Sequence, residues 1–380
     1  MVPSRSCLLA VGMLLPLSAN PAEVDVLPDL RAVKAEGVGS AKARTAWDRL
    51  VEQGPAVLPS ILAAMDTPDT VVANWLRLAF DDIVERERKA GGKKVDVDAL
   101  LVFARDAKRQ GRPRRLALDL AEELRPGERK KLLAGWIDDP TFREDAIDDL
   151  LERLQRDKTL PKDKALDALR KGFEASRDLA QSRAIASLLK ERGTTVSVAD
   201  HMGFLGDWYL IGPFDSRGGK GFSHAYQPEK KVVLDLTLYG KGGKKVTWKR
   251  TTVPETTAGR FPILIDLLGP LGKADDAVAY AYTAFSVPAE RTVEFRGAAD
   301  DNFTVWVNGV RVFGFEEYQN GVRLDRHRFP VKLRAGENTV LVKVCQAPGD
   351  ANGAANWEFL LRITDPTGRG ITFPSALKAR

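Results

Sequence analysis

The sequence predicts two folded parts, an α-helical array followed by an antiparallel β-sandwich. From residue 26 to about residue 200, apolar residues recur at spacings of three and four, which is the period of amphipathic helices. After residue 203, short β-branched and aromatic runs bounded by turn residues follow one another, which is typical of strands. The length of 380 residues is ample for two hydrophobic cores.

Composition and charge fit a globular protein. Hydrophobic residues make up 44% and charged residues 29% of the chain. The formal net charge of +6 favours solubility and some affinity for polyanions, without identifying the polyanion. Cys345 is the single cysteine beyond the first residues, which excludes an intramolecular disulfide and a Cys-rich zinc site there. Because Cys345 lies in an alternating strand-like run, we expect a buried, small apolar side chain.

Residues 1–22 have the pattern of a signal peptide. Arg5 precedes the apolar stretch 8–17, and small residues follow, so cleavage after Ala19 or Ala22 is expected. The pattern predicts a periplasmic or secreted protein, with an N-terminal anchor or a misassigned start as the alternatives. No later stretch approaches the ~18 apolar residues of a membrane span.

The helical part is expected over residues 26–200. Trp47 and Leu50 belong to the first clear stripe, which Gly54 ends, and Pro68 opens a further helix. Each short helix carries one apolar stripe that it cannot bury alone, so the helices are expected to stack. The later helices are predicted at 97–107, 114–124, 128–136, 143–154, 162–173 and 177–191.

Two motifs in this part resemble HEAT-type repeats. Residues 47–62, Trp-x-x-Leu-x-x-x-Gly-Pro-x-x-Leu-Pro-x-x-Leu, are similar to the unit of one helix, a Gly turn and the next helix. Asp139-Pro140-x-x-Arg143 resembles the helix start of these repeats, and Asp66-Thr67-Pro68 echoes it 72 residues earlier with Val71 in the Arg position. The resemblance implies a protein-binding array; an irregular helical bundle is the alternative.

The β part is expected to contain about ten short strands. Val307-Asn308-Gly309-Val310 predicts a hairpin, because Asn-Gly tolerates the positive φ angles of a type I′ turn. Trp306 is expected to point inward with Phe303 or Val305. The strands are predicted at 208–214, 231–239, 245–252, 279–287, 291–297, 303–307, 310–315, 327–333, 338–345 and 357–364.

Two further motifs resemble the galactose-binding-like jelly roll, in the form that accompanies family two glycoside hydrolases. They are the hairpin Val305-Trp-Val-Asn-Gly309 and the turn Leu333-x-x-Gly336-x-Asn338, in the order the family uses. The resemblance covers roughly residues 203–370, within a β domain expected over 203–375, and implies a sugar-binding module without catalytic residues. This implication is an analogy at the level of the fold.

Sugar sites combine an exposed aromatic face with polar side chains on loops, and two loops offer both. The first holds Arg217, His224 and Tyr226, and the second holds Asn356 and Trp357. Tyr318, after two glutamates, is a third candidate. The alternative for Phe222 and Trp357 is that they cap the sandwich core.

Asp300, Asp301 and Asn302 form an oxygen-rich loop before the central hairpin. Carboxylate and amide oxygens suit Ca²⁺, and the pair resembles the Asp-Asp loop of protective-antigen-type lectin domains, in which Ca²⁺ and sugar share the two carboxylates. The alternative is a solvated turn, since Asp-Asp-Asn is ordinary turn composition.

Basic residues gather between Arg105 and Lys131 in the helical part. They suggest an anionic polysaccharide, or a solvated face, because Asp119, Glu122 and Glu123 are interleaved. Nucleic acid is not expected of an exported protein.

No nucleophile elbow, His-Glu-x-x-His motif or dinucleotide fingerprint occurs in the sequence. We therefore expect a non-catalytic extracytoplasmic protein that binds carbohydrate through the sandwich and contacts proteins through the helices. The alternatives are a purely structural scaffold, and an accessory to polysaccharide processing or an unrecognised hydrolase.

Overall fold

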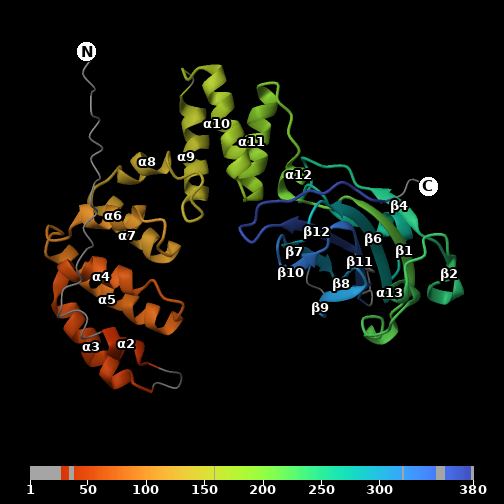
Figure 1. Ribbon diagram of the computed structural model, residues 1–380, viewed down its shortest axis with the longest axis horizontal. Coiled ribbons are helices and arrows are strands. Elements are labelled where there is room, and N and C mark those ends of the chain that lie inside the picture. The colour runs from red at the N-terminus through yellow and green to blue at the C-terminus, as the bar shows by residue number, and fades with distance from the viewer. Residues whose placement is uncertain (1–26, 34–37, 158, 319–320, 348–355, 378–380) are drawn as a thin grey trace, which may run out of the picture. The chain divides into compact units, whose positions relative to one another are not determined.

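The computed structural model describes residues 27–33, 38–157, 159–318, 321–347 and 356–377 (Figure 1). Helices extend to Met202 and strands begin at Asp207, which confirms the predicted order of a helical part and an antiparallel sandwich. The chain divides into two compact units between Ala146 and Ile147, so the last helices belong to the same unit as the sandwich. The predicted signal peptide lies outside the described residues.

The first unit is built from short helices that each bury one apolar stripe. Gly54, at a φ of 73°, separates the first long helix from the next. Asp69 caps another helix by accepting hydrogen bonds from the backbone N–H groups of Val71 and Val72. Within the described ranges, no helix is long and apolar enough to cross a membrane. The helices are α2 (Leu27–Arg31), α3 (Ser40–Glu52), α4 (Leu58–Ala64), α5 (Thr70–Lys89), α6 (Val97–Arg105), α7 (Gly111–Leu124) and α8 (Glu128–Leu133), and α9 (Arg143–Arg156) spans the division.

Asp139, the acid of the Asp-Pro motif, pairs with a buried arginine. Arg114 is 2% exposed, donates to the Ala104 carbonyl and places Nη2 2.6 Å from Oδ2 of Asp139. Asp139 also accepts from the backbone N–H of Thr141. Burial alone would raise the pKa of Asp139, but these bonds hold it below its ordinary value. Arg114 is therefore a structural residue and not part of a solvated basic face.

Three helices in the second unit precede the sandwich. They are α10 (Lys162–Ala175), α11 (Leu179–Glu191) and α12 (Val198–Met202). The side chain of Asp178 caps α11, which explains why this helix begins two residues later than the predicted position 177. The side chain of Ser197 caps α12, and Gly203 ends it with a φ of 78°.

The sandwich consists of a six-stranded and a four-stranded sheet, and every described strand pair is antiparallel (Figure 1). The larger sheet has the order β4-β1-β6-β11-β8-β9, and the smaller has the order β10-β7-β12-β5. Asn308 and Gly309 both have positive φ, as the predicted hairpin between β8 and β9 requires. The strands are β1 (Asp207–Asp215), β4 (Lys249–Thr252), β5 (Ile265–Asp266), β6 (Ala277–Val287), β7 (Arg291–Asp300), β8 (Asn302–Val307), β9 (Val310–Phe315), β10 (His327–Leu333), β11 (Gly336–Gln346) and β12 (Glu358–Thr364).

Side chains alternate between the two faces of the six-stranded sheet. Phe303 and its partner Val344 are buried between the sheets, where the Phe303 ring lies against Gly297 of β7. Trp306 lies on the opposite, outer face, packed with Leu341. The expectation that Trp306 points inward with Phe303 was therefore wrong, since residues three apart on a strand face opposite sides.

A second cluster of apolar residues covers the outer face of the six-stranded sheet. Residues 216–248, which connect β1 to β4 and are named here the cover segment, contribute Val246 and Trp248 to it. Strand residues of the cluster include Tyr280 and Cys345, which is fully buried as predicted. Only β2 (Leu238–Tyr239) forms within the predicted strand 231–239, because Val232 and Leu234 pack down onto the sheet face.

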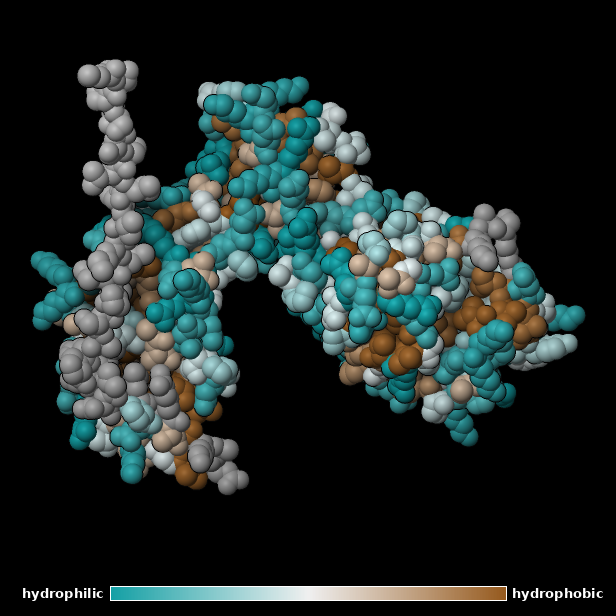
Figure 2. All heavy atoms as spheres, viewed as in Figure 1, coloured by the Kyte–Doolittle hydropathy of each residue, from teal (hydrophilic) through white to brown (hydrophobic). Residues whose placement is uncertain are grey.

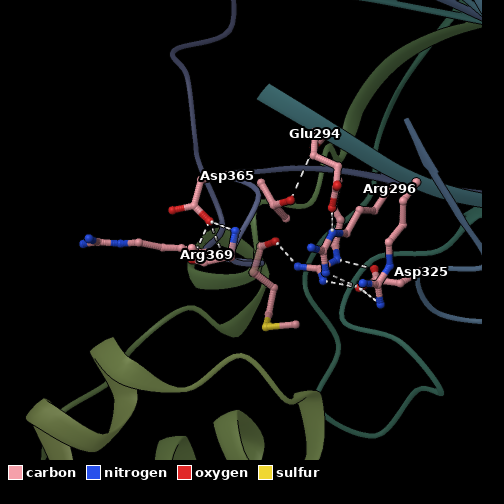
Figure 3. A network of polar contacts seen from close by, with 10 residues as sticks. Glu294, Arg296, Asp325, Asp365 and Arg369 are labelled. Atoms are coloured by element: carbon pink, nitrogen blue, oxygen red, sulfur yellow. Dashed lines mark hydrogen bonds and ion pairs between the residues drawn. The ribbon is translucent and has the colours of Figure 1, made fainter. Parts of the chain in front are cut away.

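A buried ion-pair network joins α12 to the sandwich (Figure 3). Arg362 of β12 is 1% exposed, binds both carboxylate oxygens of Asp325 at 2.6 and 2.5 Å, and donates to the Met202 carbonyl at 3.0 Å. Arg296 of β7 donates to the same carboxylate at 2.7 Å. Burial alone would raise the pKa of Asp325, but the two arginines hold it below its ordinary value.

Candidate functional site

The second predicted sugar loop does not present its aromatic ring to solvent. Trp357 is 0% exposed and lies in the sandwich core. Its ring cannot stack on a sugar in this structure, so the core-capping alternative holds for this residue. Asn356 is exposed, and its carbonyl accepts a hydrogen bond from Nε2 of Gln346 at 2.8 Å.

Two residues of the first predicted loop hold the cover segment in place. The ring of Tyr226 packs against Phe214 at a centroid distance of 4.9 Å, and its hydroxyl donates to the Asp215 carbonyl. Burial, followed by the charge of Asp215, raises the pKa of Tyr226. The carbonyl of His224 accepts from Nζ of Lys343 at 2.8 Å. These contacts give the Tyr226 side chain and the His224 backbone structural roles, while the His224 side chain is exposed.

The structure brings the turn after Arg217 close to Tyr318. Arg217 is exposed and pairs with Asp215 at 2.8 Å, while the hydroxyl of Tyr318 lies beside Gly219. Burial raises the pKa of Tyr318. In the part of the chain that the structure describes, no hydrogen bond or ion pair joins Arg217 to Tyr318 or either of them to Asn356.

Asp300 and Asp301 lie side by side at the end of β7. Asp301 is buried, and its Oδ2 accepts from the backbone N–H of Ala347 at 2.7 Å. Burial, a hydrogen bond to Asp301 and the charges of Asp301 and Glu358 raise the pKa of Asp300 to about 7. Over the described residues, no group of three or more His, Cys, Asp or Glu side chains could hold a metal ion. Calcium at this pair remains a prediction.

A pocket on the outer face of the six-stranded sheet was not among the predicted sites. Tyr282 of β6, Leu341 of β11 and Trp306 of β8 are in register, so they form a row across three strands. Tyr282 and Trp306 are half-buried, and all three side chains line a cavity of about 240 Å³. The register could be inferred from the sequence only once the strand pairing was known. Figure 2 shows apolar surface over β8 and β9 with polar side chains around it.

The other wall of this pocket, named here the Trp306 pocket, comes from the cover segment. Glu229, Lys230 and Lys231, in and just after α13 (Gln227–Lys230), line it. The carboxylate of Glu229 is held by Lys343 at 2.7 Å and by the hydroxyl of Tyr280. Lys230 and Lys231 are exposed. The pocket therefore combines aromatic rings with two ammonium donors.

The tyrosine side chain of the Trp306 pocket is uncharged at neutral pH. Burial, followed by the charge of Glu337, raises the pKa of Tyr282, so its phenol is protonated at neutral pH. Such a site can bind a ring face by stacking and hydroxyl or acidic groups by hydrogen bonds.

A contact between Ser176 and His201 does not form an accessible nucleophilic site. Oγ of Ser176 lies 3.0 Å from Nε2 of His201 and 2.8 Å from Oγ of Ser182. Both serines are 0% exposed. Burial lowers the pKa of His201, so the ring is neutral at neutral pH. These groups form hydrogen bonds with one another where α10, α11 and α12 meet.

Comparison with known proteins gives a distant structural likeness alone. No family model matches the sequence, and no curated protein matches it. A β-glucuronidase of Ruminococcus gnavus is similar at 18% identity over 43% of this chain and 28% of that chain, with a TM-score of 0.25. A β-glucuronidase of an uncultured Clostridium sp. is similar at 12% identity over 43% of this chain and 29% of that chain, with a TM-score of 0.24. Similarity at this level, over less than a third of those enzymes, assigns neither a family nor an activity.

Proposed function

We propose that this protein is a non-catalytic, exported binding protein whose β-sandwich holds carbohydrate in the Trp306 pocket. The row of Tyr282, Leu341 and Trp306 carries the proposal, because it leaves two aromatic side chains half-exposed on rigid strands. Elsewhere the cover segment buries the apolar side chains of this face. A half-exposed tryptophan beside a pocket is the feature on which a sugar ring stacks.

The size of the Trp306 pocket fits one sugar ring of a longer glycan. Its volume of about 240 Å³ lies below the roughly 300–1,000 Å³ usual for drug-sized ligands. Thr339 and the two lysines of the wall supply polar groups for hydroxyls, and Gly309 lines the rim without a side chain. A glycan that continues past the rim of the pocket therefore meets no bulky side chain at Gly309.

The test is a glycan array followed by calorimetry on the full chain. Trp306→Ala is expected to weaken binding of the best glycan at least tenfold, or about 1.4 kcal/mol. Tyr239→Ala is the matched control, because Tyr239 is 71% exposed and does not line the pocket. Equal losses in the two variants, or a folded protein that binds no glycan, would rule out the proposal.

Protein binding by the helical unit is the second candidate function. Val71 and Leu78 of α5 are 42% and 59% exposed, and they lie two turns apart on one helix face. Exposed apolar side chains on one face favour a partner contact. The test places a crosslinking residue at position 74, between Val71 and Leu78, and identifies the exported protein to which it becomes joined. Loss of the crosslink in Leu78→Lys is expected, and its persistence would count against this surface.

Export is tested at the N-terminus of the protein as cells produce it. Mass spectrometry of material recovered from the periplasm or medium is expected to show a chain that begins after Ala19 or Ala22. A full-length chain confined to the cytoplasm would overturn this part of the proposal.

A further inference from the structure

We infer that the ligand of the Trp306 pocket is an acidic polysaccharide, one that carries carboxylate or sulfate groups. The inference rests on the proposed function and specifies its ligand class. Its basis is the uneven distribution of charge between the cover segment and the rest of the chain, together with the place of that charge around the aromatic row.

The cover segment carries nearly all of the net charge of the protein. Residues 216–248 contain seven Lys and Arg residues but only two acidic ones, an excess of five positive charges. The remaining 347 residues hold 51 basic and 50 acidic residues, so they contribute one of the six net charges. A charge excess confined to one connection between strands points to an anionic partner at that surface.

Most of these cations are not neutralised within the protein. Arg217 pairs with Asp215, and Lys241 donates to the carbonyls of Asp275 and Asp276. The carboxylate of Glu229 is occupied by Lys343, which lies outside the segment. Five lysines of the segment are exposed and form no ion pair with a described residue: Lys220, Lys230, Lys231, Lys244 and Lys245.

Positively charged side chains lie beside the aromatic row. Lys230 and Lys231 line the pocket wall, and Arg311 of β9 is the register partner of Trp306. The guanidinium of Arg311 lies over the ring of Phe222 in the cover segment, 5.8 Å from its centroid. Glu337 is the acidic group whose charge acts on Tyr282. The cations outnumber this acid, so the surroundings of the pocket favour an anion.

Charge and aromatic stacking together select the ligand class. The hydroxyls of a neutral sugar that stacks on Trp306 accept hydrogen bonds from the lysines but leave their positive charges without a counter-charge. A carboxylate or sulfate on the sugar forms charge-assisted bonds with them. A nucleic acid or an anionic membrane would use the charges, but it would not need the sugar-sized pocket.

The experiment compares polygalacturonate with its fully methyl-esterified form, because the two share a backbone and differ in charge. Heparin and its desulfated form make a second pair for sulfate. We expect the full chain to bind the acidic member of at least one pair at least tenfold more tightly at 50 mM salt, with the difference shrinking at 500 mM. Single-stranded DNA and phosphatidylglycerol vesicles serve as the competing polyanions.

Three variants separate the inference from the proposed function. Lys230→Gln/Lys231→Gln is expected to reduce binding of the acidic polymer to the level of its neutral form and to leave the neutral form unchanged. Lys162→Gln/Lys164→Gln on α10 removes the same charge from exposed positions outside the sandwich and is expected to change nothing. Trp306→Ala is expected to weaken both forms.

Each remaining outcome is decisive. Equal binding of acidic and neutral forms, lost in Trp306→Ala, overturns the acidic preference and leaves carbohydrate binding standing. Binding of the acidic polymers, DNA and vesicles alike, unaffected by Trp306→Ala, shows a non-specific basic surface and overturns both. A folded protein that binds neither member of either pair also overturns the acidic preference.

Discussion

The ammonium nitrogen of Lys343 lies 2.7 Å from Oε1 of Glu229, although Lys343 is only 1% exposed. The same nitrogen donates to the carbonyls of Phe222 at 3.0 Å and His224 at 2.8 Å. One buried cation on β11 therefore fixes three points of the cover segment. Because Glu229 lines the Trp306 pocket, this contact also sets the position of the pocket wall.

Replacing Lys343 by Met is expected to loosen the cover segment while the strands stay folded. The change leaves the Glu229 carboxylate with the Tyr280 hydroxyl but without its counter-charge, and it leaves two carbonyls without their donor. A broken buried pair costs about 3–5 kcal/mol. Limited trypsin digestion is expected to cut faster after Lys220, Lys230 or Lys231. Lys332→Met, on an exposed pair with Glu290, is the control and is expected to behave as the wild type. An unchanged digestion pattern in Lys343→Met would contradict this role.

Replacing Asp325 by Asn is expected to destabilise the second unit by about 3–5 kcal/mol at pH 7, because Arg362 stays buried without a counter-charge and Arg296 keeps only Glu294. Because the folded-state pKa of Asp325 lies below its unfolded value near 3.9, the contribution is present above that pH and is lost as the pH falls below it. The difference in melting temperature from the wild type should therefore shrink below pH 4. Glu290→Gln, at an exposed ion pair, should cost at most about 1 kcal/mol. A loss as small as that of Glu290→Gln would show that the network does not hold this junction.

Replacing Asp300 by Asn is expected to raise the melting temperature at pH 8 more than at pH 4. The pKa of Asp300 is raised to about 7 by burial and by Asp301, so the folded state favours its protonated form. That stability is present below the unfolded pKa near 3.9 and is lost as the pH rises through 7. The amide removes the repulsion at high pH. Thermal unfolding across this pH range measures it, and a gain that is the same at pH 4 and pH 8 would contradict the shift.

Replacing Gly203 by Ala is expected to disrupt the junction of α12 with β12. A Cβ there would lie 2.1 Å from the Ile363 carbonyl oxygen, and the residue has a φ of 78°. Gly309→Ala is the matched control, since its φ is 81° but nothing lies within 4 Å of an added Cβ. The control isolates the cost of the positive φ, about 1–2 kcal/mol. Thermal unfolding is expected to show a clearly larger loss for Gly203→Ala, and equal losses would mean that the backbone contact is unimportant.

Local pattern located the hairpin at Asn308-Gly309 and the helix that Pro68 precedes, because turn chemistry and helix starts depend on a few neighbouring residues. It failed at residues 231–239. That run has the composition of a strand, yet Val232 and Leu234 lie flat on a sheet face that only the fold creates.

At the candidate site, too, local sequence pattern predicted residue composition but not which side chains the fold buries. The sequence singled out Tyr226 and Trp357 as sugar contacts, since an aromatic beside Gly and Asn has the composition of a binding loop. In the structure, the ring of Tyr226 packs against Phe214, and Trp357 lies in the core. Trp306 was instead assigned to the interior, because alternation along a strand does not say which face is covered.

The sequence by itself determined the order of a helical part and a β part, since that order depends on composition and short-range periodicity. Only the tertiary structure decided that Tyr282, Leu341 and Trp306 stand in one row beneath the basic cover segment. The physical reason is that the register pairs Tyr282 with Leu341, 59 positions apart in the chain, and the burial of a whole sheet face selects that register.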